Sequence, residues 1–189
     1  MRIAILGWGS LVRSPGSLAI VGEWRTGGPI LPIEFSRISD DGRLTLVIDE
    51  DVGVDVSTRY VMSSFEDLGL AIADLQKREK APTDRGVGFV CAGEGPQAEH
   101  AVARHPKSLE TIRTWLADRP IDAVLWTAIG PRFKEKVGEP FSVEAAVRYL
   151  KGLREPARSL AYAYIMAAPD DVSTPVRTRA KQLLDSSTA

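Results

Sequence analysis

A carboxylate occupies a position where an apolar side chain is expected in the helical segment 64–80. At 100° per residue the apolar residues of this segment form one stripe, and Glu79 is the next position on it. The stripe consists of Phe65, Leu68, Ile72 and Leu75. A carboxyl group that faces the protein interior or a cavity has a raised pKa, which suits it to proton transfer. The alternative is that the helix ends here and the Glu79 side chain reaches solvent.

A second candidate group follows the first expected strand, in the sequence MRIAILGWGSL. Gly7 and Gly9 bracket Trp8, and Ser10 and Leu11 come directly after them. Glycine allows the backbone to approach a ligand closely and to adopt positive φ. A strand that runs into such a turn often presents N–H groups to an anion or a carbonyl oxygen. These five residues therefore form a candidate binding loop, and the alternative is that the glycines only shape a tight corner.

Two known motifs do not fit this loop. Gly7 and Gly9 begin a dinucleotide-binding fingerprint, but Val12 occupies the third glycine position. Pro15 then interrupts the helix that should begin at once. Ser10 does not lie in a G-x-S-x-G sequence and no histidine is near it, so we expect a hydrogen-bond donor rather than a nucleophile.

The composition is that of a globular protein with one domain, since 44% of the 189 residues are hydrophobic and 26% are charged. A net charge of −1 gives no indication of nucleic acid or an anionic membrane as a partner. No apolar stretch is long enough for a membrane span, and the N-terminus lacks a signal-peptide pattern. Cys91 is the single cysteine, which excludes an internal disulfide. We therefore expect a protein of a reduced compartment, the cytoplasm.

No metal site is expected from the histidines. His100 and His105 are five residues apart, a spacing that does not place both on one helix face, and no second cysteine joins them. We interpret both as solvent-exposed loop residues.

The hydrophobic pattern predicts an α+β fold with strands in the first two thirds and helices at the end of the chain. The expected strands are 2–7, 30–39, 43–50, 54–63, 85–93 and 121–129. The expected helices are 64–80, 108–118, 142–153, 156–168 and 174–186, with Ser64, Ser108 and Thr174 as N-caps of three of them. No regular helical crossovers separate the strands, which favours a mixed or mainly antiparallel sheet, such as a small barrel. We expect a single domain over 1–189, with a core at about 1–130 and a helical C-terminal extension at about 140–186.

The loop and the carboxylate together resemble the γ-glutamylcyclotransferase-like superfamily. GWGSL after an N-terminal strand is similar to the Tyr-Gly-Ser-Leu loop of that family. The family also has a strand followed by a segment ending in Leu-x-x-x-Glu, and RYVMSSFEDLGLAIADLQKREK is similar, with Leu75 and Glu79 at the matching places. The resemblance covers roughly residues 1–130 and implies a small mixed β-barrel with flanking helices.

The resemblance also implies an activity. The family cyclises a γ-glutamyl amine or peptide to 5-oxoproline and releases the amine, without a cofactor or a metal. By this match Glu79 is the catalytic acid/base, and a small-molecule γ-glutamyl substrate is the expected partner. The substrate loop would consist of Gly7, Trp8, Gly9, Ser10 and Leu11.

The sequence departs from the family pattern at three places. Trp8 replaces the usual loop tyrosine, Lys80 replaces a glycine that often follows the glutamate, and the helices after Phe141 have no clear counterpart in small members. A non-catalytic member of the same fold, which binds a small metabolite or a protein in the same cavity, is therefore the alternative to an enzyme.

Overall fold

The computed structural model describes residues 1–81 and 83–187, so the predicted single domain 1–189 ends on two residues outside the described part. One sheet has the order β2 (Ile20–Arg25), β6 (Arg59–Ser63), β1 (Ile3–Gly7), β8 (Ala123–Thr127) and β7 (Val87–Cys91). The other has the order β4 (Leu44–Ile48), β3 (Ile30–Ile38) and β5 (Val54–Ser57). The helices are α1 (Ser10–Arg13), α2 (Leu68–Glu79), α3 (Glu99–Arg104), α4 (Pro106–Ala117), α5 (Phe133–Val137), α6 (Val143–Gly152), α7 (Ala157–Met166) and α8 (Pro175–Ser187), with a 3-10 turn η1 (Asp84–Gly86).

The expected α+β class is confirmed. In the larger sheet β1 pairs with β8 in parallel and with β6 antiparallel, whereas the smaller sheet is antiparallel throughout. The expected barrel is not confirmed, because the strands of the described chain form two separate sheets that do not close on themselves.

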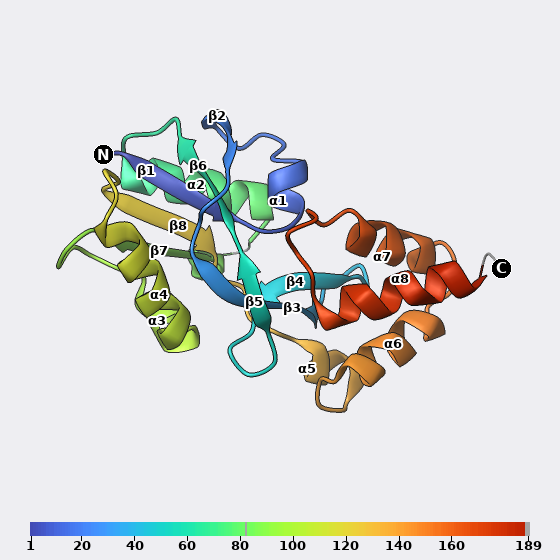
Figure 1. The fold of residues 1–189 in the computed structure, drawn as a ribbon. Helices are drawn as coiled ribbons and strands as arrows, with labels where there is room; N and C mark the ends of the chain where they lie inside the picture. The colour runs from blue at the N-terminus through green and yellow to red at the C-terminus, as the bar shows by residue number, and fades with distance from the viewer. Residues whose placement is uncertain (82, 188–189) are drawn as a thin grey trace.

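The side chains of β1 divide the core between the two faces of the larger sheet, as alternation along a strand requires. Ile3 and Ile5 belong to a cluster beneath α2, which includes Leu75. Ala4 and Leu6 belong to a second cluster on the opposite face, which continues through the smaller sheet and into α6, α7 and α8. Figure 1 shows these three helices gathered beside β3 and β4. The C-terminal helices therefore share a continuous apolar core with the strands.

The strand predicted over 54–63 is two strands, β5 and β6, that belong to different sheets. The extended segment is interrupted at the buried Thr58, between β5 and β6. Thr58 Oγ1 donates to the Pro29 carbonyl at 2.7 Å. The Thr58 carbonyl in turn accepts from the Gly28 N–H at 3.0 Å. A Cβ on Gly28 would lie 2.5 Å from Thr58 Oγ1, so glycine is required for this close crossing. Alternation along a strand carries no signal for a change of sheet.

Two of the three predicted N-caps are wrong. Helix α2 begins at Leu68, and Asp67 rather than Ser64 is its N-cap, because Asp67 Oδ1 accepts from the Leu70 N–H at 2.9 Å. Helix α4 begins at Pro106, so Ser108 lies buried in its first turn. The prediction that Thr174 precedes α8 with a proline at the first position is confirmed.

The histidines are not the exposed loop residues that we expected. His105 is 2% exposed, and its pKa is lowered to about 4 because burial and the nearby Arg104 disfavour the charged form. His100 lies in α3, with Nε2 3.0 Å from the Val87 carbonyl oxygen. Among the described residues, no three His, Cys, Asp or Glu side chains are arranged to hold a metal ion. No described helix has both the length and the apolar character to cross a membrane.

Candidate functional site

The predicted loop and the predicted carboxylate line the same cavity, which has a volume of about 860 Å³. The β1–α1 loop forms one wall and contributes all five of its predicted residues, Gly7, Trp8, Gly9, Ser10 and Leu11. Glu79 comes from the C-terminal end of α2. The β3–β4 hairpin and α7 supply the remaining walls. The fold thus brings the loop 7–11 and Glu79 to one cavity, although the strands β2 to β6 lie between them in the sequence.

The loop glycines are required by close packing rather than by positive φ. Gly9 precedes α1 with φ of −142°, and Gly7 is not among the glycines with positive φ. A Cβ on Gly7 would lie 2.7 Å from the Trp24 ring, and a Cβ on Gly9 would lie 3.2 Å from Leu46 Cδ1. Neither glycine therefore uses positive φ, and the close packing at this corner favours a residue without a Cβ at both positions.

Trp8 and Leu11 are core residues that also line the cavity. Both are buried, with 6% and 5% exposure, and both also line the cavity. Trp8 belongs to the core cluster that contains Leu46, whereas Leu11 belongs to the cluster beneath α2. Of the predicted apolar stripe, Leu75 belongs to the same cluster as Leu11, and Phe65, Leu68 and Ile72 are partly buried and pack against that cluster. The loop is therefore anchored in both halves of the core.

Glu79 faces the cavity, as its position on the apolar stripe predicts. Its side chain is 17% exposed, and burial raises the pKa of its carboxyl group. The guanidinium of Arg78 opposes this shift, since Nη1 lies 3.2 Å from Glu79 Oε1. The carboxylate therefore has both a desolvated environment and a cationic neighbour, Arg78, that can stabilise its charged form.

Arg78 also ties the end of α2 to the segment that follows α1. Its Nε donates to the Pro15 carbonyl at 3.0 Å, and its Nη2 donates to the Ser14 carbonyl at 2.7 Å. One side chain thus fixes the segment after α1 and contacts the candidate acid/base. Sequence reasoning missed this role, because the carbonyls that Arg78 binds lie more than sixty residues away.

Lys80 follows Glu79 in a left-handed conformation with φ of 51° and caps α2. Its N–H donates to the Lys77 carbonyl at 3.2 Å. This is the position at which the resembling family often has glycine, the residue that this region of φ favours. The backbone at the end of α2 therefore retains a glycine-type turn, although the side chain is lysine.

Tyr164 of α7 is a cavity residue that sequence reasoning missed. Its pKa is raised chiefly by burial; a hydrogen bond with the Ser10 side chain opposes the shift, and the negative charge of Glu79 adds to it. The Arg43 guanidinium carbon lies 5.1 Å from the centre of the Tyr164 ring. A helix of the C-terminal extension thus places a phenol beside both Ser10 and Glu79. The resemblance ends before this helix, so it gave no signal for Tyr164.

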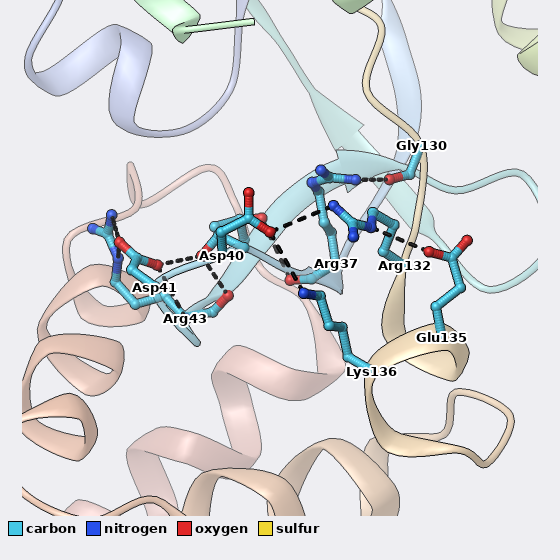
Figure 2. A network of polar contacts seen from close by, with 10 residues as sticks. Arg37, Asp40, Asp41, Arg43, Gly130, Arg132, Glu135 and Lys136 are labelled. Atoms are coloured by element: carbon cyan, nitrogen blue, oxygen red, sulfur yellow. Dashed lines mark hydrogen bonds and ion pairs between the residues drawn. The ribbon is translucent and has the colours of Figure 1, made fainter. Parts of the chain in front are cut away.

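The β3–β4 hairpin forms a charged wall of the cavity (Figure 2). Asp41 accepts from Arg43 Nε at 2.8 Å, and Asp40 forms ion pairs with Arg132 at 3.6 Å and with Lys136 at 3.5 Å. Arg37 lines the cavity from β3.

Ser36, the neighbour of Arg37 in β3, is fully buried in the protein. The strand aromatics Tyr60 and Trp126 do not line this cavity. Tyr60 packs edge-on against Trp115 at 5.2 Å, and Trp126 is fully buried in the core.

Comparisons of the chain with protein-family models, with curated proteins and with solved structures give no match.

Proposed function

We propose that this chain is a γ-glutamylcyclotransferase-like enzyme of the cytoplasm, which converts a γ-glutamyl amine or peptide to 5-oxoproline and a free amine. One observation carries the proposal: the desolvated Glu79 carboxyl group and the glycine-bracketed loop face one cavity. A cavity of about 860 Å³ has room for a γ-glutamyl dipeptide.

The first step of this reaction requires a base. The α-ammonium group of the substrate must lose a proton before its nitrogen can attack the γ-carbonyl carbon, and the leaving nitrogen must then gain one. A single carboxylate with a raised pKa can accept the first proton and deliver it to the leaving amine. Glu79 is the cavity carboxylate whose pKa burial raises, so we assign it both steps.

The attack is intramolecular, so the enzyme gains most by holding the substrate in its bent conformation. The β1–α1 loop lies at the cavity wall, and Arg78 Nη2 donates to the Ser10 carbonyl at 3.4 Å, which would help to hold the loop in place for this purpose. N–H groups of Gly9 and Ser10 would stabilise the negative charge that develops on the γ-carbonyl oxygen. The Ser10 hydroxyl, which lies beside the phenol of Tyr164, would donate to the substrate as well.

Tyr164 would compensate for Trp8, which occupies the position where the loop of the resembling family usually has tyrosine. The indole of Trp8 is packed in the core cluster and supplies no hydroxyl group. The phenol of Tyr164 reaches the same loop from α7 and contacts Ser10. We infer that the C-terminal helices supply from another element the phenol that the loop of this chain lacks.

A non-catalytic binding protein is the second candidate, and one observation favours it. The ion pair with Arg78 at 3.2 Å stabilises the charged form of Glu79 and opposes the rise in its pKa. A carboxylate held permanently in this pair would fix the loop without transferring protons.

A substrate panel separates the two candidates. The panel contains γ-glutamyl amines and γ-glutamyl peptides, with release of 5-oxoproline as the measurement. The proposed enzyme releases 5-oxoproline from at least one class of compound at a rate proportional to protein concentration. Binding of these compounds without any release of 5-oxoproline would contradict the enzyme and favour the binding protein.

A further inference from the structure

The guanidinium of Arg78 has a partner on each of its nitrogen atoms. Nη1 donates to Glu79 Oε1 at 3.2 Å, and Nε donates to the Pro15 carbonyl at 3.0 Å. Nη2 donates to the carbonyls of Ser14 at 2.7 Å and Ser10 at 3.4 Å. Since a guanidinium is planar and rigid, these contacts fix the Glu79 carboxylate relative to the segment that contains the three carbonyls.

The contact between Arg78 and Glu79 does not follow from the helix alone. Adjacent residues of an α-helix lie about 100° apart around its axis and do not face each other. The Arg78 side chain instead runs along the turn after α1, where a Cβ on Gly16 would lie 3.6 Å from Arg78 Cδ. The carbonyls after α1 therefore hold the guanidinium at the place where it meets Glu79.

Glu79 is the acidic partner of Arg78, and the other partners are neutral carbonyl groups. In the part of the chain that the structure describes, no second carboxylate forms an ion pair with Arg78. The positive charge is therefore not shared with another acid. It stabilises the charged form of Glu79 in a place where burial favours the protonated form.

Other titratable groups line the cavity from the elements around Glu79. Tyr164 of α7 is a neutral phenol near pH 7, because burial raises its pKa. The charged groups come from α1, from the β3–β4 hairpin and from the end of α2, and they are Arg13, Arg37, Asp40, Asp41, Arg43 and Lys80. Arg78 is in direct contact with the Glu79 carboxylate and lowers its pKa against the effect of burial. A substitution of Arg78 should therefore change the charge state of Glu79.

The proposed reaction requires Glu79 to be ionised before the first proton transfer. A protonated carboxyl group cannot accept the proton that the α-ammonium group of the substrate must lose. Burial alone works against the ionised form, and Arg78 opposes burial. A carboxylate that is both desolvated and paired can then accept a proton and give it up again to the leaving amine.

We propose that Arg78 is a positioning residue that keeps Glu79 in its carboxylate form and holds this carboxylate beside the β1–α1 loop. One guanidinium then sets both the charge and the place of the base. The ion pair becomes part of the catalytic arrangement instead of a permanent structural contact. This inference rests on the proposed function, because it takes Glu79 as the base.

The test follows the titration of Glu79 directly. NMR of the full chain, labelled with carbon-13 at the side-chain carboxyl groups of glutamate, records each group as the pH changes. The signal that is missing in Glu79→Gln identifies the group. We expect Glu79 to titrate at higher pH in Arg78→Gln than in the parent protein, because glutamine has no charge to oppose burial. Lys77→Gln is the matched control, since Lys77 is an exposed cation in the last turn of α2 and should leave the midpoint unchanged.

The pH profile of 5-oxoproline release is the second readout. The acid limb of kcat/KM reports the ionisation of the base in the free enzyme. In Arg78→Gln this limb should move to higher pH together with the NMR midpoint. At neutral pH kcat/KM should fall about 10- to 100-fold, because the carboxylate is also less well placed. A merely structural role of Arg78 would lower the rate at every pH and leave the limb at the position of the parent protein.

Arg78→Lys separates the charge from the planar fork, and it decides the matter if Arg78→Gln does not fold. A compact ammonium group cannot replace all the contacts of the guanidinium with Glu79 and the three carbonyls. We therefore expect either a higher midpoint of Glu79 or faster amide hydrogen exchange in residues 10–16.

An unchanged Glu79 midpoint in a folded Arg78→Gln protein would overturn the proposal. An Arg78→Lys protein that matches the parent in both midpoint and amide exchange would overturn it as well. A higher midpoint in Arg78→Gln, without any release of 5-oxoproline by the parent protein, would support the control of Glu79 by Arg78 and contradict only the proposed enzyme.

Discussion

At the scale of single residues, Glu79 predicts a pH dependence of stability. Burial raises its folded-state pKa above the unfolded value, so its contribution is fully present below the unfolded pKa. That contribution is lost as the pH rises through the folded-state pKa, and Arg78 limits the loss by stabilising the carboxylate. We expect the stability of the parent protein to fall relative to Glu79→Gln as the pH rises above about 4.5.

The measurement is the urea midpoint of both proteins at closely spaced pH values between about 4 and 8. Glu66→Gln is a suitable control, since Glu66 is an exposed residue just before α2. A stability difference between the parent and Glu79→Gln that stays constant over this range would show that burial does not raise the pKa of Glu79.

The position of a residue could be predicted where it depends only on the sequence around that residue. The position of Glu79 on the stripe of α2 needs only the helical period, and the structure places it at the cavity accordingly. The buried state of His105 could not be predicted this way, because it depends on which parts of the fold pack around the residue. The same holds for Arg37, since strand alternation left open whether it faces the cavity or solvent.

At the scale of elements, the end of α2 contains a strained residue. Lys80 has φ of 51°, a conformation that favours glycine. We expect Lys80→Gly to stabilise the protein by about 0.5–1 kcal/mol, because relief of the left-handed strain exceeds the extra entropy of glycine in the unfolded chain. Urea denaturation at fixed pH measures the change.

Lys77→Gly is the matched control, because Lys77 is exposed in the last turn of the same helix. Glycine there should destabilise the protein by about 1 kcal/mol. Destabilisation by both substitutions would mean that the lysine side chain at position 80 contributes more than its backbone conformation costs.

The existence of most elements could be predicted, but their neighbours in the fold could not. The strand segments and the C-terminal helices follow from apolar periodicity and turn residues. The break between β5 and β6 escaped prediction, because it depends on contacts of Thr58 with Gly28 and Pro29. The start of α2 was misplaced because Ser64 and Asp67 are both acceptable N-caps, and only the structure distinguishes them.

At the scale of the whole molecule, the polar contact between the Ser10 and Tyr164 side chains joins the first loop to the C-terminal helices. We expect Ser10→Ala and Tyr164→Phe each to lower the free energy of unfolding by about 0.5–1.5 kcal/mol. The double variant should lose clearly less than the two losses together, because both substitutions remove the same contact. Chemical denaturation of the four proteins completes this cycle.

Strict additivity in the cycle would contradict a direct link between the loop and α7. The sequence could not have indicated this link, since the two residues lie at opposite ends of the chain and α7 is outside the resemblance. The apolar positions of α7, Ala161 and Ile165, predict a packed helix and do not identify Tyr164 as a cavity residue.

The most direct test of the proposed enzyme is the rate of 5-oxoproline release by Glu79→Gln, with Glu66→Gln as control and with folding checked by circular dichroism. Glutamine keeps the shape and a carbonyl acceptor but cannot carry the proton. The account predicts a folded Glu79→Gln protein whose rate is at least about 10²-fold lower, with ligand binding largely retained and Glu66→Gln fully active. Release of 5-oxoproline by Glu79→Gln at the rate of the parent protein would contradict it.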